Sequence, residues 1–383
     1  MEMNPETLKL NKMFEDIYDL KPTERVPIMW SADNAFCLDF TGANLRTDQY
    51  DIDKNLEAIE KVTALFDTDV VAGVMLRIPA LYKVLGARNF VMGADGFIQH
   101  PNIHGMEVED YDDLIKDPYK TIWDKVFPRL YGEIEKGGYD AMRAAARSFF
   151  IFFTTMGKLG GGYAGIANKL GKSTYSLAAG AACVPFDTLC DQLRSFTGIM
   201  ADIRRIPQKV IDACDALVPF MLKAGISQDS SKYVRTFIPL HMGPYMKPKD
   251  FEKFYWPSFK AFVEGLDAAG TAANIFVEQD YTPYVDYLAD LPKGQLLYIE
   301  YGDPKLFKDK LGEKHILMGM YPLDHVRTGT PDKCVDEAKK LLDIVAPGGK
   351  YIFACDKQAL HKEDVNEENL KAVLSYVKNN TKY

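Results

Sequence analysis

The second half of the chain alternates regularly between strands and helices, and this alternation limits the folds that the chain can adopt. Strands are expected at 234–241, 273–278, 296–301, 315–320 and 351–355, and helices after them at 249–269, 282–291, 304–311, 330–344 and 367–377. Consecutive strands that are joined through helices form a parallel sheet. No GxGxxG motif follows an early strand, which disfavours an open, doubly wound sheet. We therefore predict an α/β fold, a closed (β/α)8 barrel of the TIM type.

The first half of the chain is less regular and predicts additions to the barrel. Residues 1–20 have apolar side chains at helical spacing and form an N-terminal helical extension, so the barrel itself is expected at 21–383. Glycines and prolines punctuate residues 89–104, which indicates a hairpin insertion. An alanine-rich helix is expected at 139–153, and the glycine triplet Gly160–Gly162 after it predicts a hinge or a helix break.

The composition indicates which binding partners and which cellular compartment to expect. The net charge is −8 and no basic run occurs, so nucleic acid is not an expected partner. No stretch reaches the roughly 18 apolar residues that span a bilayer, and the charged N-terminus lacks the apolar core of a secretory signal. The 6 cysteines have no paired spacing. Free thiols are typical of a reducing compartment, so we expect no membrane association and a cytoplasmic protein.

Polar side chains stand where the predicted strands end, which is where active sites of such barrels lie. His241, Glu278 and Cys355 end three of these strands. Each has an ordinary alternative: a loop histidine, a structural ion pair, and a small buried hydrophobe. Together they would form a zinc site with three protein ligands and one open position. Tyr281 and the pair Tyr301 and Asp303 follow two of the strands and are candidate proton donors.

Several stretches resemble one family along most of the chain. They are Lys249-Asp250-Phe251-Glu252-Lys253-Phe254-Tyr255-Trp256-Pro257, Leu291-Pro292-Lys293-Gly294, Arg327-Thr328-Gly329-Thr330-Pro331, Gly348-Gly349-Lys350-Tyr351-Ile352-Phe353-Ala354-Cys355, Val184-Pro185-Phe186-Asp187 and Asp191-Gln192-Leu193-Arg194. The chain resembles the uroporphyrinogen decarboxylase-like superfamily. One branch of this superfamily decarboxylates uroporphyrinogen, and the other transfers methyl groups to or from corrinoid proteins.

Two departures indicate which branch the chain resembles. The decarboxylases carry arginines after the first strand, whereas residues 30–37 here contain none. The coenzyme M methyltransferases hold zinc with an H-x-C pair and a later cysteine, and here Phe276-Val277-Glu278 replaces H-x-C while Cys355 is kept. The resemblance therefore implies the O-demethylase subgroup, with Glu278 and Cys355 as zinc ligands. His241 is added as the third ligand because of its place at a neighbouring strand end.

These observations predict a zinc-dependent methyltransferase. It would move a methyl group from a small methylated donor, a methoxylated aromatic, to cob(I)alamin (the reduced cobalamin) on a separate corrinoid protein. Tyr281, Tyr301 or Asp303 would protonate the leaving oxygen. One alternative is a metal-free decarboxylase or lyase that uses Asp33 or Asp69, and another is a catalytically silent barrel that binds a ligand or a corrinoid. The oligomeric state, including a homodimer, is left open by the sequence.

Overall fold

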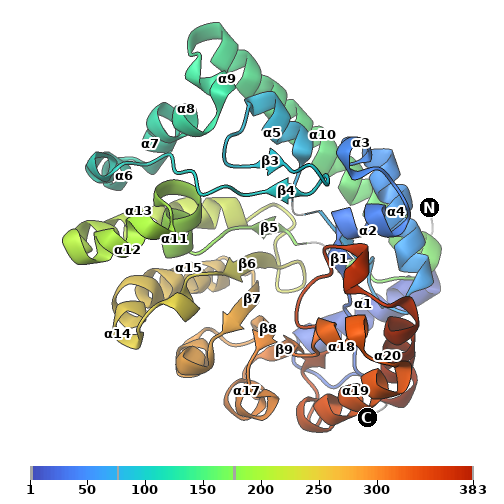
Figure 1. The fold of residues 1–383 in the computed structure, drawn as a ribbon. Coiled ribbons are helices and arrows are strands. Elements are labelled where there is room, and N and C mark those ends of the chain that lie inside the picture. The colour runs from blue at the N-terminus through green and yellow to red at the C-terminus, as the bar shows by residue number, and fades with distance from the viewer. Residues whose placement is uncertain (1–2, 76, 176–177, 382–383) are drawn as a thin grey trace.

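The structure is a computed structural model that describes residues 3–75, 77–175 and 178–381 (Figure 1). Its centre is a parallel sheet of six strands in the order β10-β9-β8-β7-β6-β5, accompanied by a parallel pair, β1 and β2. The strands of this α/β fold are β1 (Ala32–Asp33), β2 (Gly73–Val74), β5 (Gly180–Ala181), β6 (Thr236–Leu240), β7 (Ala273–Asp280), β8 (Leu296–Tyr301), β9 (Ile316–Gly319) and β10 (Tyr351–Ile352).

Isolated parallel bridges extend the pairing of these strands around a ring. Ile28, just before β1, pairs with Phe353, and the N–H of Met29 donates to the carbonyl of Phe353 at 2.9 Å. On the other side Val70, just before β2, pairs with Ser173, seven residues before Gly180 of β5. The predicted TIM-type barrel is therefore confirmed; β6 to β9 are its longer strands, whereas β1, β2, β5 and β10 have two residues each.

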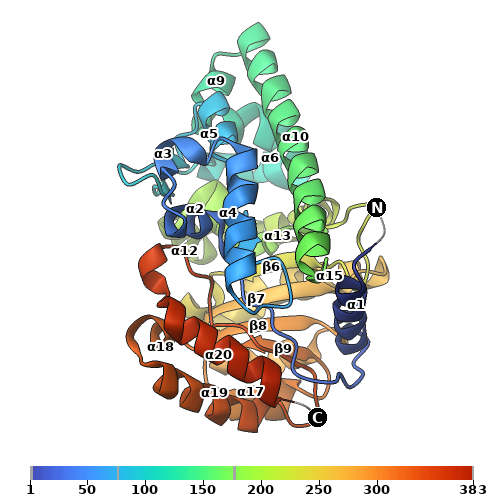
Figure 2. The same ribbon diagram turned by 90° about the vertical axis from the view of Figure 1, so that its right-hand side faces the viewer.

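Helices surround the ring and add a layer above it (Figures 1 and 2). The longer ones are α1 (Pro5–Tyr18), α2 (Asn34–Phe40), α4 (Ile52–Leu65), α5 (Pro79–Leu85), α10 (Gly138–Leu170), α12 (Phe196–Arg205), α13 (Pro207–Gly225), α15 (Trp256–Ala268), α16 (Val285–Asp290), α17 (Pro304–Leu311), α18 (Leu323–Thr328), α19 (Pro331–Val345) and α20 (Glu367–Asn380). No helix of the described residues is long and apolar enough to cross a membrane.

Alternate residues of the last strands face two separate cores, as the strand period of two requires. On β8, Leu296 and Tyr298 pack inside the barrel, whereas Leu297 and Ile299 pack outward against the helices. The inner core also includes apolar residues of α1, which covers the end of the barrel where the strands begin. The opposite end, where the strands finish, is the mouth.

Two predictions about the first half have different outcomes. The insertion at 89–104 is confirmed as an antiparallel hairpin of β3 (Val91–Met92) and β4 (Ile98–Gln99). The predicted break at Gly160–Gly162 is wrong, because α10 runs through the triplet without interruption. Leu159 and Tyr163 on the inner face of α10 are buried, and the Tyr163 hydroxyl donates to the Gly73 carbonyl at 2.7 Å. These contacts outweigh the cost of about 1 kcal/mol for each glycine in a helix.

Candidate active site

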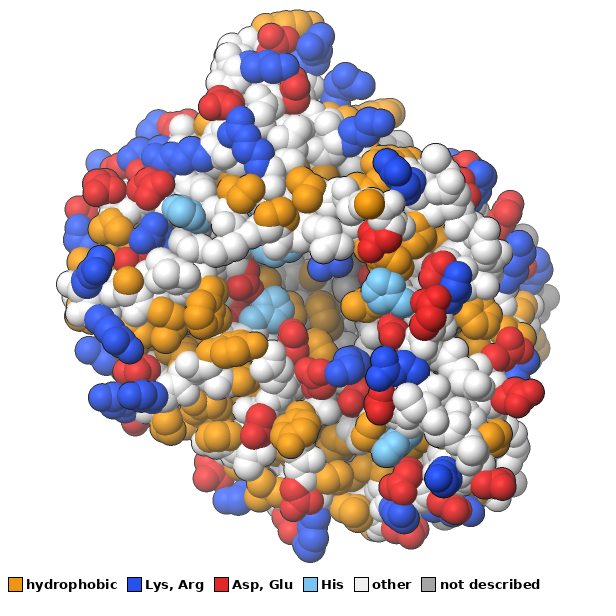
Figure 3. Space-filling view, viewed as in Figure 1, with side chains coloured by type: hydrophobic (Ala, Val, Ile, Leu, Met, Phe, Trp, Pro, Cys, Tyr) orange, Lys and Arg blue, Asp and Glu red, His pale blue; other side chains and the backbone are white. Residues whose placement is uncertain are grey.

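The mouth of the barrel opens as a hollow near the centre of the face in Figure 3, bordered by histidine and acidic side chains. His241, directly after β6, lies in this region with about a third of its side chain exposed. Its Nδ1 is hydrogen-bonded to the Asp191 carboxylate, and its Nε2 lies 3.4 Å from Oε2 of Glu278, on β7. The structure thus brings together two of the predicted site residues, His241 and Glu278.

A buried carboxylate fixes the backbone at this point. Asp187 accepts hydrogen bonds from the N–H groups of His241 and Met242, both at 3.0 Å, and from the Tyr255 hydroxyl at 2.8 Å. The Tyr255 hydroxyl in turn lies 3.4 Å from that of Tyr281. This network holds the end of β6 in place, so that the imidazole of His241 is positioned from behind.

The surrounding carboxylates determine the charge of His241. Burial lowers the pKa of His241, but the hydrogen bond to Asp191 and the negative charges of Asp187, Asp191 and Glu278 outweigh burial and raise it to about 9. Burial raises the pKa of Glu278, which the positive charge of His241 opposes, and burial raises the pKa of Asp187 to about 7. At neutral pH the site therefore holds an imidazolium at His241 beside a partly protonated Asp187.

The three predicted proton donors do not converge on His241. Tyr281 is fully buried, and its hydroxyl faces Tyr255 in the network behind the mouth. Tyr301 is 64% exposed at the rim. Asp303 caps the N-terminus of α17, where it accepts from the N–H of Lys305 at 2.9 Å. Their catalytic role stays a prediction, and His241 is the proton carrier that the mouth itself presents.

Cys355 lies away from the other two predicted zinc ligands. Ile352 and Ala354 of its strand segment belong to the inner core, so Cys355 faces outward and packs in the outer core beside the helices. Burial raises the pKa of its thiol well above the usual range, which disfavours the thiolate that zinc needs. Among the described residues no group of three or more His, Cys, Asp and Glu side chains is arranged to hold a metal ion. The predicted ligand set therefore does not fit zinc as it stands.

A cavity of about 250 Å³ lies at the ends of the first, second and last strand segments, beneath the hairpin. It is lined by Asp33, Asn34, Ala35, Gln49, Met75, Arg77, Pro79, Phe97, Ile98, Gln99, Leu360 and His361. The side-chain oxygen of Asn34 is buried and has no hydrogen-bond partner among the described residues. Burial lowers the pKa of His100, next to the hairpin, and Arg77 and His241 lower it further while Asp191 opposes them. His100 therefore lies within the electrostatic reach of both the cavity and the His241 site.

Sequence reasoning assigned no role to Asp187 and Asp191. They stand four residues apart in a helical turn that follows β5 directly (α11, Pro185–Asp187, continued by the π-helical segment Thr188–Arg194). Residues at this spacing share one helix face. Two acidic residues on one face of the helical turn after a barrel strand indicate a candidate site. The strand before them, however, is too short to be identified from its sequence.

The chain was compared with known proteins. The sequence model of the family described as uroporphyrinogen decarboxylase (URO-D) matches residues 167–380. Among solved structures, a methyltransferase from Methanosarcina mazei is similar, with a TM-score of 0.63 at 16% sequence identity, covering 96% of this chain and 98% of that one. No curated protein matches the chain in sequence. The structural similarity extends over nearly the whole length of both chains and supports the barrel fold.

Proposed function

The chain belongs to the uroporphyrinogen decarboxylase family, and on this premise we propose that it is a methyltransferase. It moves a methyl group from a small methylated donor, a methoxylated aromatic, to cob(I)alamin on a separate corrinoid protein. The observation that carries the proposal is the protonated His241, held by Asp191 and facing Glu278 at the open mouth. The fold shared with the Methanosarcina mazei methyltransferase is consistent with it.

His241 supplies what an ether donor needs in order to react. When the methyl carbon is attacked, its bond to oxygen breaks and the bonding electrons stay on the oxygen. The Nε2 proton of His241 passes to this oxygen, so that an alcohol or a phenol leaves instead of an anion. Asp191 holds the ring from the Nδ1 side. Cobalamin on the docked corrinoid protein supplies the nucleophile.

The cavity beneath the hairpin has the size and polarity to hold a donor with one aromatic ring. Its volume of about 250 Å³ is below the ~300–1,000 Å³ typical of pockets for drug-sized ligands, and too small for a tetrapyrrole. Arg77 brings a positive charge to its wall, and no hydrogen bond or ion pair of its guanidinium occurs within the described part of the chain. The carboxylate of a methoxylated aromatic acid would complement this positive charge.

Zinc remains a prediction that no step above requires. His241 and Glu278 are adjacent, but Cys355 is not placed to complete a site with them. Metal analysis of the purified protein tests the prediction directly. Stoichiometric zinc that is lost in Glu278→Ala and in Cys355→Ala would show that these two residues bind it after a rearrangement of the last strand end.

Methyl transfer is tested with the purified protein, its corrinoid protein reduced to cob(I)alamin, and methoxyarenes that carry a labelled methyl group. We expect the label to move to the corrinoid protein and an equal amount of phenol to form. His241→Gln should lower the rate by about 10²–10³-fold, whereas His104→Gln, which removes an exposed histidine elsewhere, should not. If no methoxyarene, amine or thioether donates its methyl group, the proposal fails. Binding of a donor without any turnover would instead indicate that the protein is a catalytically silent barrel that binds a ligand.

A metal-free lyase is a second candidate, favoured by the cavity itself. Burial raises the pKa of Asp33, and the backbone N–H of Ala35 and the charge of Arg77 oppose the rise, so a carboxyl with a raised pKa lines the same cavity as a cation. Arg77 would hold a substrate carboxylate, and Asp33 would protonate the carbon from which carbon dioxide leaves. Asp69, the other carboxylate considered for this role, is bound by Arg25 on both oxygens at 2.7 Å and is not free to act. Release of carbon dioxide without methyl transfer would identify this activity.

A further inference from the structure

The strand that carries Glu278 is irregular at its end. Between two regular pairs of β7 and β8, the two residues Glu278 and Gln279 of β7 lie opposite the single residue Glu300 of β8, which makes a β-bulge. Gln279 has a φ of +63°, in the left-handed region that residues other than glycine rarely adopt. Bulges and backbone strain are concentrated near active sites. The strained bulge therefore indicates that the end of β7 is built for the site at the mouth.

The bulge separates two carboxylates that would otherwise be direct neighbours. Phe276 of β7 pairs with Tyr298 of β8, and both side chains pack in the inner core. Without a bulge, the same register would place Glu278 directly opposite Glu300, with both side chains facing inward. Like charges on directly opposite residues destabilise a sheet. Because the bulge ends this pairing, each carboxylate can bind a cation of its own.

The two carboxylates do have separate partners. Oε2 of Glu278 lies 3.4 Å from Nε2 of His241. Glu300 accepts a hydrogen bond from Lys357 at 3.0 Å through one oxygen, and through the other from the backbone N–H of Gln279 at 2.7 Å. The side chain of Glu300 is only 16% exposed, and hydrogen bonds to a charged group that is shielded from water are strong. Glu300 therefore binds the strained residue itself.

We propose that Glu300 is a positioning residue. Its hydrogen bond to the backbone N–H of Gln279 holds the bulge in place. The bulge in turn keeps the carboxylate of Glu278 directed at the ring of His241. The side-chain amide of Gln279 also donates to the Tyr245 hydroxyl at 2.7 Å, so Gln279 is held at its backbone and at its side chain. The role of Glu300 in catalysis rests on the proposed function, whereas the position of Glu278 does not.

Two substitutions of Glu300 separate its hydrogen bond from its charge. Burial raises the pKa of Glu278, the charge of His241 opposes the rise, and the charge of Glu300 adds to it. If the charge were decisive, Glu300→Gln and Glu300→Ala would have the same effect, because both remove it. If the hydrogen bond is decisive, the two differ, because the amide oxygen in Glu300→Gln still accepts from the N–H of Gln279.

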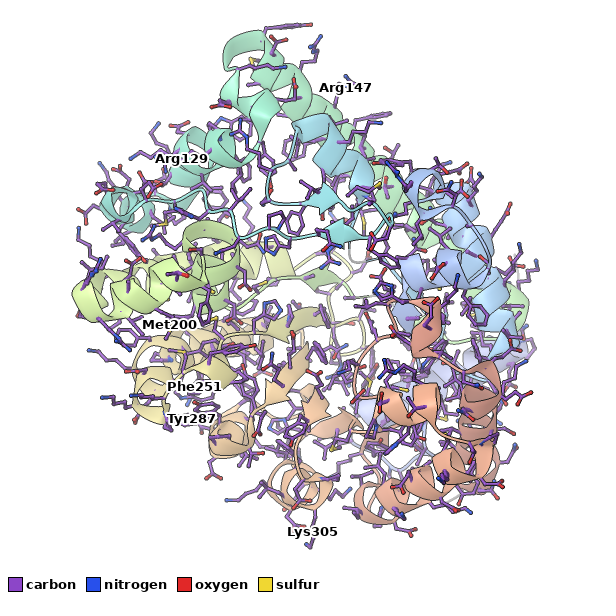
Figure 4. All side chains as sticks on the ribbon, viewed as in Figure 1. Arg129, Arg147, Met200, Phe251, Tyr287 and Lys305 are labelled. Carbon is purple, nitrogen blue, oxygen red and sulfur yellow. The ribbon has the colours of Figure 1, made fainter. Side chains whose placement is uncertain are left out.

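The ring signals of His241 in NMR spectra of the metal-free protein, recorded at a fixed pH, report the position of Glu278 without any need for catalysis. Glu300→Ala should shift these signals in the same direction as Glu278→Gln, whereas Glu300→Gln should leave them close to those of wild type. The control is Asp309→Ala, which removes an exposed ion pair with Lys305 on α17, at the outer edge of the molecule in Figure 4. The control should not move the signals.

Methyl transfer should follow the same order. Glu300→Ala should lower kcat about 10-fold or more with little change in KM, whereas Glu300→Gln should lose no more than about threefold. Gln279→Val should be as slow as Glu300→Ala, because a β-branched residue does not tolerate a φ of +63°. Gln279→Gly, combined with Glu300→Ala, should raise the rate at least about threefold, since glycine adopts this φ freely. Lys350→Val, at a φ of +61° before β10, should leave the rate per folded molecule unchanged.

Urea denaturation establishes first that each variant is folded. Wild-type ring signals and rate in Glu300→Ala would overturn the proposal, as would equal losses in Glu300→Ala and Glu300→Gln, or a Gln279→Val variant as fast as wild type. Ring signals that move as expected in a protein that transfers no methyl group would support the positioning of Glu278 by Glu300 and reject the proposed function.

Discussion

The two ends of the barrel use carboxylates in opposite ways. At the closed end Asp69 is matched by one cation: both its oxygens bind Arg25 at 2.7 Å, and one also accepts from the N–H of Ile28 at 2.8 Å. At the mouth Asp187, Asp191 and Glu278 surround one histidine. A carboxylate paired with one cation stabilises a fold, whereas several carboxylates around one histidine raise its pKa, so that the histidine holds a proton that it can donate. The comparison separates a structural pair from a candidate catalytic group.

Removal of the matched pair should have the largest effect. Asp69→Ala leaves the buried Arg25 without its partner and should lower the free energy of unfolding by about 3–5 kcal/mol, measured by urea denaturation. The exposed pair Lys339–Asp336 provides the control, because Asp336→Ala should cost less than ~1 kcal/mol. Equal losses in the two variants would mean that the closed end does not depend on its ion pair.

Next in size is a change in the pH profile of methyl transfer. Asp191→Asn removes the charge that raises the pKa of His241, so the imidazolium loses its proton at a lower pH. The alkaline limb of the rate profile should move to lower pH, and a shift of one unit lowers the rate above the limb about 10-fold. Asn keeps the shape of the side chain, so binding of the donor should change little. An unchanged profile would exclude His241 as the proton donor.

Cys355→Ala should have a smaller effect that concerns stability alone. The thiol lies in the outer core, so its loss should cost about 1–2 kcal/mol by leaving a small cavity. Methyl transfer per folded molecule should stay within about twofold of wild type (a difference of under ~0.5 kcal/mol). Loss of both bound metal and activity in this variant would restore Cys355 as a metal ligand.

A further expected effect is the pH dependence of stability in the metal-free protein. The pKa of His241 is raised from 6.5 to about 9, so its proton stabilises the folded state fully below pH 6.5, and this contribution is lost as the pH rises through 9. The pKa of Asp187, raised to about 7, acts with the same sign at lower pH. Urea midpoints should therefore fall between pH 6.5 and 9, and less so in His241→Gln. An equal fall in both proteins would assign the effect to other groups.

The sequence predicted those parts of the fold in which local pattern and tertiary packing agree. Strand β8 and helix α17 have the bounds that were expected, because each is a continuous apolar or amphipathic stretch between turn residues. The predicted break at the glycine triplet was wrong because it rested on local sequence, where glycine weakens a helix. The burial of Leu159 and Tyr163, which stabilises the helix, depends on residues far away in the chain.

The site was predictable only in part, for a related reason. The ends of β6 and β7 were clear, so His241 and Glu278 were expected to be neighbours, and they are. Which face of a strand a residue occupies depends on register, and one step separates the outward Cys355 from the inward Ala354. Asp187 and Asp191 follow β5, a strand of two residues, which no periodic pattern could reveal.

The way in which the ring closes also has a consequence for how the chain is made. The first barrel segment pairs with the last, and the N–H of Val26 donates to Thr381, 355 residues away. At roughly 5–20 residues per second, a ribosome needs about 20–70 s to synthesise the stretch between them. During that time the apolar strand around Ile28 and the inner face of α1 have no partner. A nascent chain of this protein therefore needs protection until its last strand emerges, and shortened products that lack this strand should aggregate.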